Sequence, residues 1–162
     1  MTQLSHPIPP LYDENSKILI LGSFPSVKSR EQQFFYGHKQ NRFWKVLAAL
    51  LECPVPVDIA EKKKMLLGHQ IAVWDVIASC NIEGSSDASI KDVKPNDLSK
   101  ILDSCDIRAI YANGNKSYEL YQKHIYPQIH REIIKLPSTS PANAAFSLER
   151  LVGEWQLILE SL

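Results

Sequence analysis

The chain has 162 residues, of which 44% are hydrophobic and 22% charged, and its 18 basic side chains balance 18 acidic ones. This composition fits one α/β domain over residues 1–162, large enough to bury most of its surface on folding. The balanced charge excludes a globally basic nucleic-acid-binding protein, so any contact with nucleic acid requires a local basic face.

Neither a membrane span nor an export signal is visible in the sequence. No apolar run is long enough to cross a bilayer, and no basic segment followed by an apolar one begins the chain. The three cysteines, Cys53, Cys80 and Cys105, lack the spacing of a disulfide framework or a zinc site. We therefore expect a cytoplasmic protein with reduced thiols, no metal and no membrane contact.

The first third of the chain predicts a strand, a loop and a helix. Residues 1–16 are rich in proline and show no periodicity, so we expect a tail laid on the surface. Lys17–Leu21 is predicted to be a buried strand, closed by Gly22 in the turn GSFPS. A polar and aromatic loop follows. Apolar side chains then recur at helical spacing up to Leu51, with Asn41 at the expected N-cap.

The middle of the chain continues this alternation. Asp58 is predicted to cap a helix that runs to about Leu67. Gln70–Ala78 is predicted to be the second strand, since it is almost entirely apolar. Residues 79–92 are polar and rich in serine, so we expect a loop, and a third helix is expected over residues 95–104.

The rest of the chain adds two strands and two helices. Strands are predicted at Ile107–Ala112 and Glu132–Leu136, separated by a helix over Lys116–Tyr126, and a last helix begins near Ser147. Four strands that alternate with helices predict a three-layer αβα fold, with a parallel four-stranded sheet between two layers of helices.

Two stretches resemble motifs of a known family. The string YGHKQNRFWKV at residues 36–46 resembles the first motif of the uracil-DNA glycosylase superfamily, in its mismatch-specific branch and in its hypoxanthine (deoxyinosine) branch. The string LPSTSPANAAFSLERLVGEW at residues 136–155 resembles the second motif and the helix behind it. The resemblance implies the strand order 2-1-3-4.

The same resemblance implies a function. Such a protein is a monomeric glycosylase without a cofactor, which flips a deaminated base (hypoxanthine or uracil) out of duplex or single-stranded DNA and hydrolyses its N-glycosidic bond with water. The mismatch-specific branch carries its catalytic asparagine in the first turn, where Phe24 stands here. The hypoxanthine branch uses the asparagine of the first motif, which is Asn41. This difference favours the hypoxanthine branch.

Asn41 and Asp75 are the candidate catalytic residues. The amide of Asn41 can hold a water molecule but cannot take its proton at neutral pH, so an acid such as Asp75 or Asp87 is needed nearby for a high rate. Each candidate also has a structural explanation. Asn is an excellent helix cap, and an acid in an apolar run requires only a partner or a place at the strand's end.

A base-binding pocket is expected at the carboxyl ends of the strands, where open α/β sheets bind ligands. The resemblance assigns stacking on the base to Tyr36, and backbone N–H groups in the turn after the first strand can face a base carbonyl. The alternative is that this turn and the aromatic side chains serve packing alone. The expected pocket residues are Gly22, Ser23, Phe24, Pro25, Tyr36, His38 and Asn113.

The second motif offers hydroxyl and amide groups that suit hydrogen bonds to phosphate oxygens, contacts that position DNA without reading its sequence. Its alternative role is a rigid turn that caps the last helix. Nearby basic side chains would add a local positive rim. The expected DNA-binding residues are Lys39, Arg42, Ser138, Thr139, Ser140 and Asn143.

Two other classes of function use the same fold. Doubly wound sheets also bind nucleotides or flavins in these loops without catalysis, and a bound mononucleotide after purification would favour that class. A hydrolase of free nucleosides would suit a chain of zero net charge. Comparing cleavage of deoxyinosine in an oligonucleotide with cleavage of the free nucleoside separates that class from a glycosylase.

Overall fold

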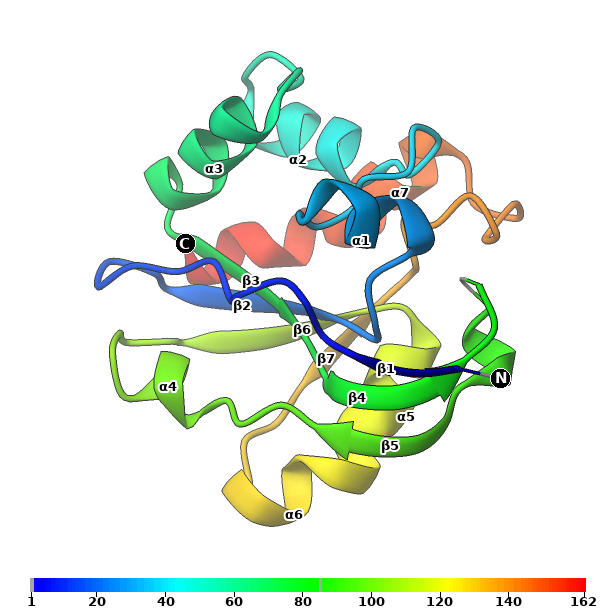
Figure 1. Ribbon diagram of the computed structural model, residues 1–162. Coiled ribbons are helices and arrows are strands. Elements are labelled where there is room, and N and C mark those ends of the chain that lie inside the picture. Colours follow the sequence, from blue (N-terminus) through cyan, green and yellow to red (C-terminus); the bar gives the residue numbers. More distant parts are fainter. Residues whose placement is uncertain (1, 85) are drawn as a thin grey trace.

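The computed structural model describes residues 2–84 and 86–162, and a parallel four-stranded sheet lies at its centre (Figure 1). The sheet contains β2 (Ile18–Gly22), β3 (Ile71–Asp75), β6 (Ala109–Asn113) and β7 (Ile134–Leu136) in the order β3-β2-β6-β7. Each neighbouring pair is parallel. Counted along the chain this is the order 2-1-3-4, so the predicted parallel sheet is confirmed.

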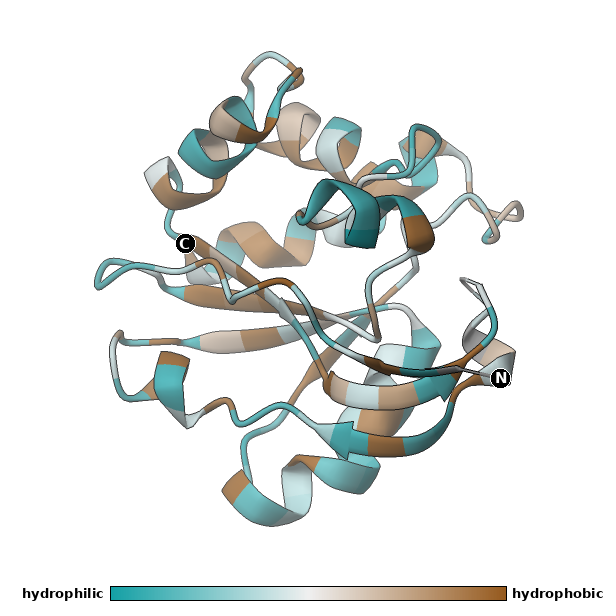
Figure 2. Cartoon of the chain, viewed as in Figure 1, coloured by the Kyte–Doolittle hydropathy of each residue, from teal (hydrophilic) through white to brown (hydrophobic). Residues whose placement is uncertain are grey.

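Alternate side chains of the sheet enter two different cores. In the central strand β2, Ile18 and Ile20 belong to one core, and Leu19 and Leu21 belong to the other. All five residues of β2 are buried, as expected for a parallel strand that is covered on both faces. The central strand β2 appears mostly brown in Figure 2, whereas the short helix α1 (Val27–Gln32) is mostly hydrophilic.

Helices cover both faces, which confirms the three-layer αβα fold. One face carries α2 (Phe43–Leu51), α3 (Ile59–Gly68) and α7 (Leu148–Trp155), which continues into the 3-10 helix η2 (Gln156–Ser161) (Figure 1). The other face carries α4 (Ser99–Leu102), α5 (Asn115–His124) and α6 (Tyr126–Ile129). None of the helices in the described part of the chain is long and apolar enough to cross a membrane.

The predicted helix ends are partly confirmed. The side chain of Asp58 caps α3 by accepting from the N–H of Glu61, and Ser147 caps α7 in the same way. The predicted loop before α2 contains the extra helix α1. The third helix is shorter than predicted, and the fourth is divided into α5 and α6.

A second, antiparallel sheet was not predicted. In it, β4 (Ile77–Ile82) pairs with β1 (Thr2–Ser5) on one side and with β5 (Lys91–Pro95) on the other. The sequence predicts a surface tail at residues 1–16 and a loop at residues 79–92, and both predictions are wrong where these strands form. The register between β4 and β5 shifts twice, and this irregularity hides the alternation by which a strand is identified.

The predicted strand Gln70–Ala78 is in fact two strands that meet at Val76. There the chain leaves the parallel sheet and enters the antiparallel one. The N–H of Val76 donates to the carbonyl of Gly22 at 2.8 Å, and the N–H of Ile77 donates to that of Ser23 at 3.1 Å. These bonds fix the end of β3 against the turn that follows β2.

Gly153 tests how the last helix contributes to stability. It is exposed inside α7, and a Cβ placed there would meet no atom within 4 Å. Because alanine is the better helix former, we expect Gly153→Ala to raise the free energy of unfolding by about 0.5–1 kcal/mol, measured by urea denaturation. The matched control is Gly84→Ala, which also has open space but a φ of +57° and should destabilise. Equal effects of the two changes would contradict this explanation.

Candidate functional site

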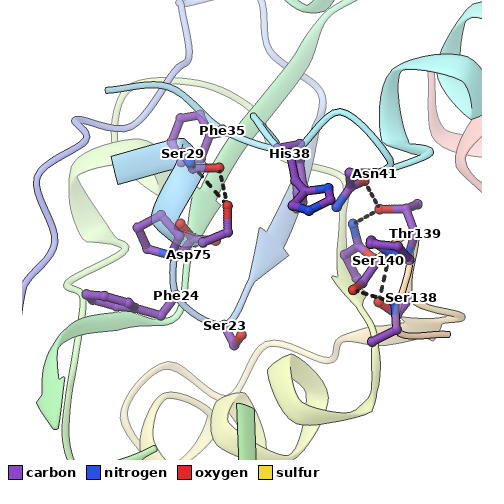
Figure 3. Close-up of a pocket in the computed structure, with 16 residues that line it drawn as sticks. Ser23, Phe24, Ser29, Phe35, His38, Asn41, Asp75, Ser138, Thr139 and Ser140 are labelled. Atoms are coloured by element: carbon purple, nitrogen blue, oxygen red, sulfur yellow. Dashed lines mark hydrogen bonds between the residues drawn. The ribbon is translucent and has the colours of Figure 1, made fainter. Parts of the chain in front are cut away.

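A cavity of about 300 Å³ opens at the carboxyl end of the parallel sheet (Figure 3). Its walls come from the ends of β3 and β6 and from the loops after β2 and β7. This volume is at the low end of the range of roughly 300–1,000 Å³ that small-molecule sites occupy. The cavity therefore suits a single small group.

Most of the residues predicted from the sequence line this cavity. They are Ser23, Phe24, Pro25, Tyr36, His38, Asn41, Asp75, Asn113, Ser138, Thr139 and Ser140. Gly22 adjoins it, because a Cβ on this residue would lie 2.3 Å from Asp75 Oδ1 and 3.3 Å from the Tyr36 hydroxyl. Only glycine fits at this position. The predicted residues therefore come together at one cavity, while the role of each residue stays a prediction.

Two hydrogen bonds to its amide oxygen hold the Asn41 side chain. Oδ1 accepts from the N–H of Phe43 at 2.9 Å and from the hydroxyl of Thr139 at 2.8 Å. Helix α2 starts at Phe43 with Arg42 as its cap residue, so the predicted N-cap is one position too early. The side chain nevertheless satisfies the first N–H of the helix. Because the oxygen is occupied, Asn41 offers its Nδ2 group to the cavity.

Thr139 is fully buried and connects Asn41 with Asn113 (Figure 3). Its Oγ1 accepts from Asn113 Nδ2 at 3.0 Å, and its N–H donates to Asn113 Oδ1 at 3.0 Å. Thr139 Oγ1 in turn donates to Asn41. The predicted role of Thr139 in DNA binding stays a prediction, but its hydroxyl is already committed inside the protein.

Arg42 holds the loop of the second motif in place. Its guanidinium donates to the carbonyls of Ser140 and Asn143 at 3.0 Å each, and also to that of Phe146. A planar guanidinium can bind several fixed acceptors at once, which a lysine cannot do. The sequence predicts a DNA contact here, and the structure adds a structural role that the sequence did not indicate.

Two more predicted DNA-binding residues, Lys39 and Asn143, lie outside the cavity lining. Lys39 is exposed on the loop before α2. Asn143 lines an adjoining pocket that it shares with Ser138 and Ser140, and its Nδ2 donates to the Ser138 carbonyl at 3.0 Å. Their contacts with DNA stay predictions.

Tyr36 has a left-handed backbone conformation, with φ of 51°, and its ring stacks on Phe43 at a centroid distance of 3.9 Å. One ring face is therefore taken, so only the other is open to the predicted stacking on a base. No described residue forms a hydrogen bond with the buried hydroxyl. Burial first, and then the charge of Asp75, raise the pKa of this hydroxyl, and the nearby Asn113 amide acts in the opposite direction. The hydroxyl thus keeps its proton at neutral pH.

Asp75 ends β3, is only 4% exposed, and has a partner that the sequence did not predict. Its Oδ2 lies 2.7 Å from Nε2 of His6, which comes from the segment expected to be a surface tail. His6 Nδ1 accepts from the N–H of Ile8 at 3.2 Å. The imidazole proton is therefore on Nε2 and is donated to Asp75. This bond supplies the partner that a buried acid needs.

Sequence reasoning also missed Ser29 and Phe35 in the cavity wall. Ser29 is buried on α1, and its Oγ accepts from the N–H of Gly37 at 2.9 Å, which ties α1 to the aromatic loop. The alternative acid, Asp87, belongs to the 3-10 helix η1 (Asp87–Ser89), but its side chain lies outside the described residues. Within the part of the chain that the structure describes, no three His, Cys, Asp or Glu side chains form a group that could hold a metal ion.

Known proteins resemble this chain over most of its length. The model of the Uracil DNA glycosylase superfamily matches residues 9–157. A Methanosarcina acetivorans protein named hypoxanthine DNA glycosylase is 36% identical over 152 residues, which is 93% of this chain and 94% of the relative. A Methanosarcina barkeri protein of the same name is 35% identical over 113 residues, covering 68% of this chain and 72% of the relative.

A solved structure shares the fold. It is a Methanosarcina acetivorans protein determined by solution NMR as a candidate uracil DNA glycosylase. Its TM-score is 0.81 at 34% sequence identity, and the match covers 97% of this chain and 96% of the other. The match therefore spans the parallel sheet and most or all of the residues that line the cavity.

The structural role of Arg42 can be separated from a DNA contact by substitution. We expect Arg42→Lys to lower the free energy of unfolding by about 1–3 kcal/mol, because one ammonium group cannot reach all three carbonyls. Urea denaturation measures this loss. Lys39→Gln is the control, since Lys39 is exposed and should leave stability unchanged. If Arg42 only attracted DNA, the charge-preserving change would not affect unfolding.

Proposed function

The chain belongs to the uracil DNA glycosylase superfamily, and we propose that it excises hypoxanthine from DNA by hydrolysing the bond between base and sugar. Uracil is the second substrate that we propose. The substrate is supported by the two relatives named hypoxanthine DNA glycosylase. The observation that carries the mechanism is the fixed amide of Asn41, which offers a hydrogen-bond donor to a cavity large enough for one base.

The size of the cavity implies that the base is extruded. A base inside a duplex cannot enter a cavity of about 300 Å³ together with its neighbours. Enzymes that act on one base solve this problem by rotating the nucleotide out of the stack. We propose that the loop of the second motif, which reaches the cavity through Ser138 and Ser140, holds the DNA backbone on either side of the flipped nucleotide.

The reaction develops charge at two places, since the sugar becomes cationic as the base departs with the bonding electrons. The Nδ2 group of Asn41 can donate to the oxygen of the attacking water or to a ring nitrogen of the departing base. Its oxygen cannot accept the proton of the water, because Phe43 and Thr139 already occupy it. Fixed donors of this kind stabilise a transition state without rearranging during the reaction.

The reaction needs no cofactor, because water is the nucleophile. We also infer that the protein works as a monomer in the cytoplasm. One chain supplies all the cavity residues described above, and the three cysteines are free thiols, as in reducing compartments.

Substitutions of Asn41 separate its structural role from the catalytic one. Asn41→Ser keeps a small side-chain acceptor near the N–H of Phe43, so we expect its melting temperature to change by only a few degrees. Without the Nδ2 donor, we expect hypoxanthine excision to fall roughly 10²-fold or more. Single-turnover cleavage of a labelled oligonucleotide at saturating enzyme measures this loss. Wild-type cleavage by this variant would reduce Asn41 to a structural residue.

Asn41→Asp distinguishes the two possible targets of the donor. The carboxylate keeps both bonds of the amide oxygen but places an acceptor in the cavity. If Asn41 holds the water, Asn41→Asp should retain more activity than Asn41→Ser, because a carboxylate can also accept the proton of the water. If Asn41 donates to the departing base, Asn41→Asp should be the slower variant, because a negative charge repels an anionic base.

A separate measurement with the wild-type protein tests the substrate class. Cleavage of free deoxyinosine at the same rate as deoxyinosine in an oligonucleotide would indicate a nucleoside hydrolase instead of a DNA glycosylase.

A further inference from the structure

A second pocket shares part of its wall with the cavity. Its volume is about 630 Å³, and it is lined by residues of β7, of the loop after β7, of the start of α5 and of α7. Ser138, Ser140 and Ala142 line both the cavity and the second pocket. The two spaces are therefore neighbours at one loop, and a ligand that fills the cavity can continue into the second pocket.

The second pocket combines positive charge with apolar surface. Lys116 and Lys135 line it, and neither forms an ion pair with a carboxylate of a described residue. The one acid among its described lining residues is Glu154, which is exposed, so positive charge prevails. Pro137 and Phe146 supply the apolar surface. Proteins hold single-stranded nucleic acid with this combination, because phosphates meet the cations and bases stack on the flat apolar groups.

Two hydroxyl groups of the shared loop can still donate hydrogen bonds. Ser138 Oγ accepts from the N–H of Ser140 at 3.1 Å, and Ser140 Oγ accepts from the N–H of Ala142 at 3.2 Å. These bonds fix the two oxygens, while no described residue accepts the hydroxyl protons. Phosphate oxygens are acceptors that serine hydroxyls commonly bind in DNA complexes. The phosphate that links two nucleotides can thus be held between the cavity and the second pocket.

We propose that the second pocket binds the nucleotide next to the flipped one on the same DNA strand, an inference that rests on the proposed function. The base of this neighbour leaves the stack and lies against Pro137 and Phe146. Its outer phosphate lies near Lys116 and Lys135. Because the neighbour has to give up its own base pair, the preferred substrate is single-stranded or weakly paired DNA.

The test removes the neighbouring base and measures binding. Single-stranded oligonucleotides carry hypoxanthine on a 2′-fluoroarabino sugar, which resists cleavage. An abasic analogue replaces the base on its 5′ side, on its 3′ side or on neither side. We expect the Kd of the wild-type protein to rise roughly 5- to 150-fold for one side and to change little for the other, because a stacked base contributes about that factor. Equal Kd values for all three oligonucleotides, or equal rises for both sides, overturn the proposal.

Substitutions of Phe146 connect this effect with the second pocket. If the neighbouring base stacks on the ring, the difference between the two sides should be largely lost in Phe146→Ala. Phe146→Leu keeps an apolar side chain and should retain part of the difference. Melting temperatures show whether both variants fold. An undiminished difference in folded Phe146→Ala places the base elsewhere and overturns the proposal.

Lys135→Gln tests the contact with the outer phosphate. We expect this change to reduce the slope of log Kd against log salt concentration by about 0.7, the value for one phosphate contact with a single strand. Lys123→Gln is the matched control, because it removes a lysine that is exposed in the last turn of α5. It should leave the slope unchanged. A wild-type slope in Lys135→Gln contradicts the proposed position of the phosphate.

Excision of hypoxanthine from a cleavable oligonucleotide tests the premise separately. If binding depends on one neighbour but the wild-type protein excises no hypoxanthine, the proposed function fails and the second pocket remains a binding site for single strands. If the protein excises hypoxanthine and its Kd depends on neither neighbour, only the role of the second pocket is overturned.

Discussion

The site depends on the hydrogen bonds that join the first motif to the second. The N–H of Arg42 donates to the carbonyl of Thr139 at 3.0 Å, and the Thr139 hydroxyl donates to Asn41. The guanidinium of Arg42 binds the next turn of the same loop. These bonds connect segments about one hundred residues apart, after β2 and after β7. Without them, each segment would be a surface loop free to move away from the cavity.

The parallel sheet could be predicted because its strands are short apolar runs that alternate with helical patterns. This signal is local, and β2 carries it in five consecutive residues. The antiparallel sheet gives no comparable signal. Its outer strand β5 is mostly exposed, and β4 has a bulged register, so neither shows the expected period. The pairing of β1 with β4 joins residues far apart in the sequence, which local patterns cannot indicate.

The candidate site could be located from the sequence, but its hydrogen-bond network could not. Tyr36, Asn41 and Ser138 lie in motifs that directly follow the strands, so their convergence follows from the topology of a parallel sheet. The orientation of the Asn41 amide depends instead on the buried Thr139, which the sequence presents as one more hydroxyl in a polar loop. His6 could not be identified from the sequence because its partner lies 69 residues away, and a lone histidine before several prolines has no characteristic pattern.

The position of His6 changes how the first residues of the chain should be regarded. Its prolines suggest a dispensable N-terminal extension, which a protein engineer would delete or replace with an affinity tag. In the structure it forms an edge strand and then delivers the only donor that any described residue gives to the Asp75 side chain. Shortening it would leave a buried charge unpaired at the cavity wall. Tags are therefore better attached at the C-terminus, which Figure 1 marks on the opposite side of the molecule from the N-terminus.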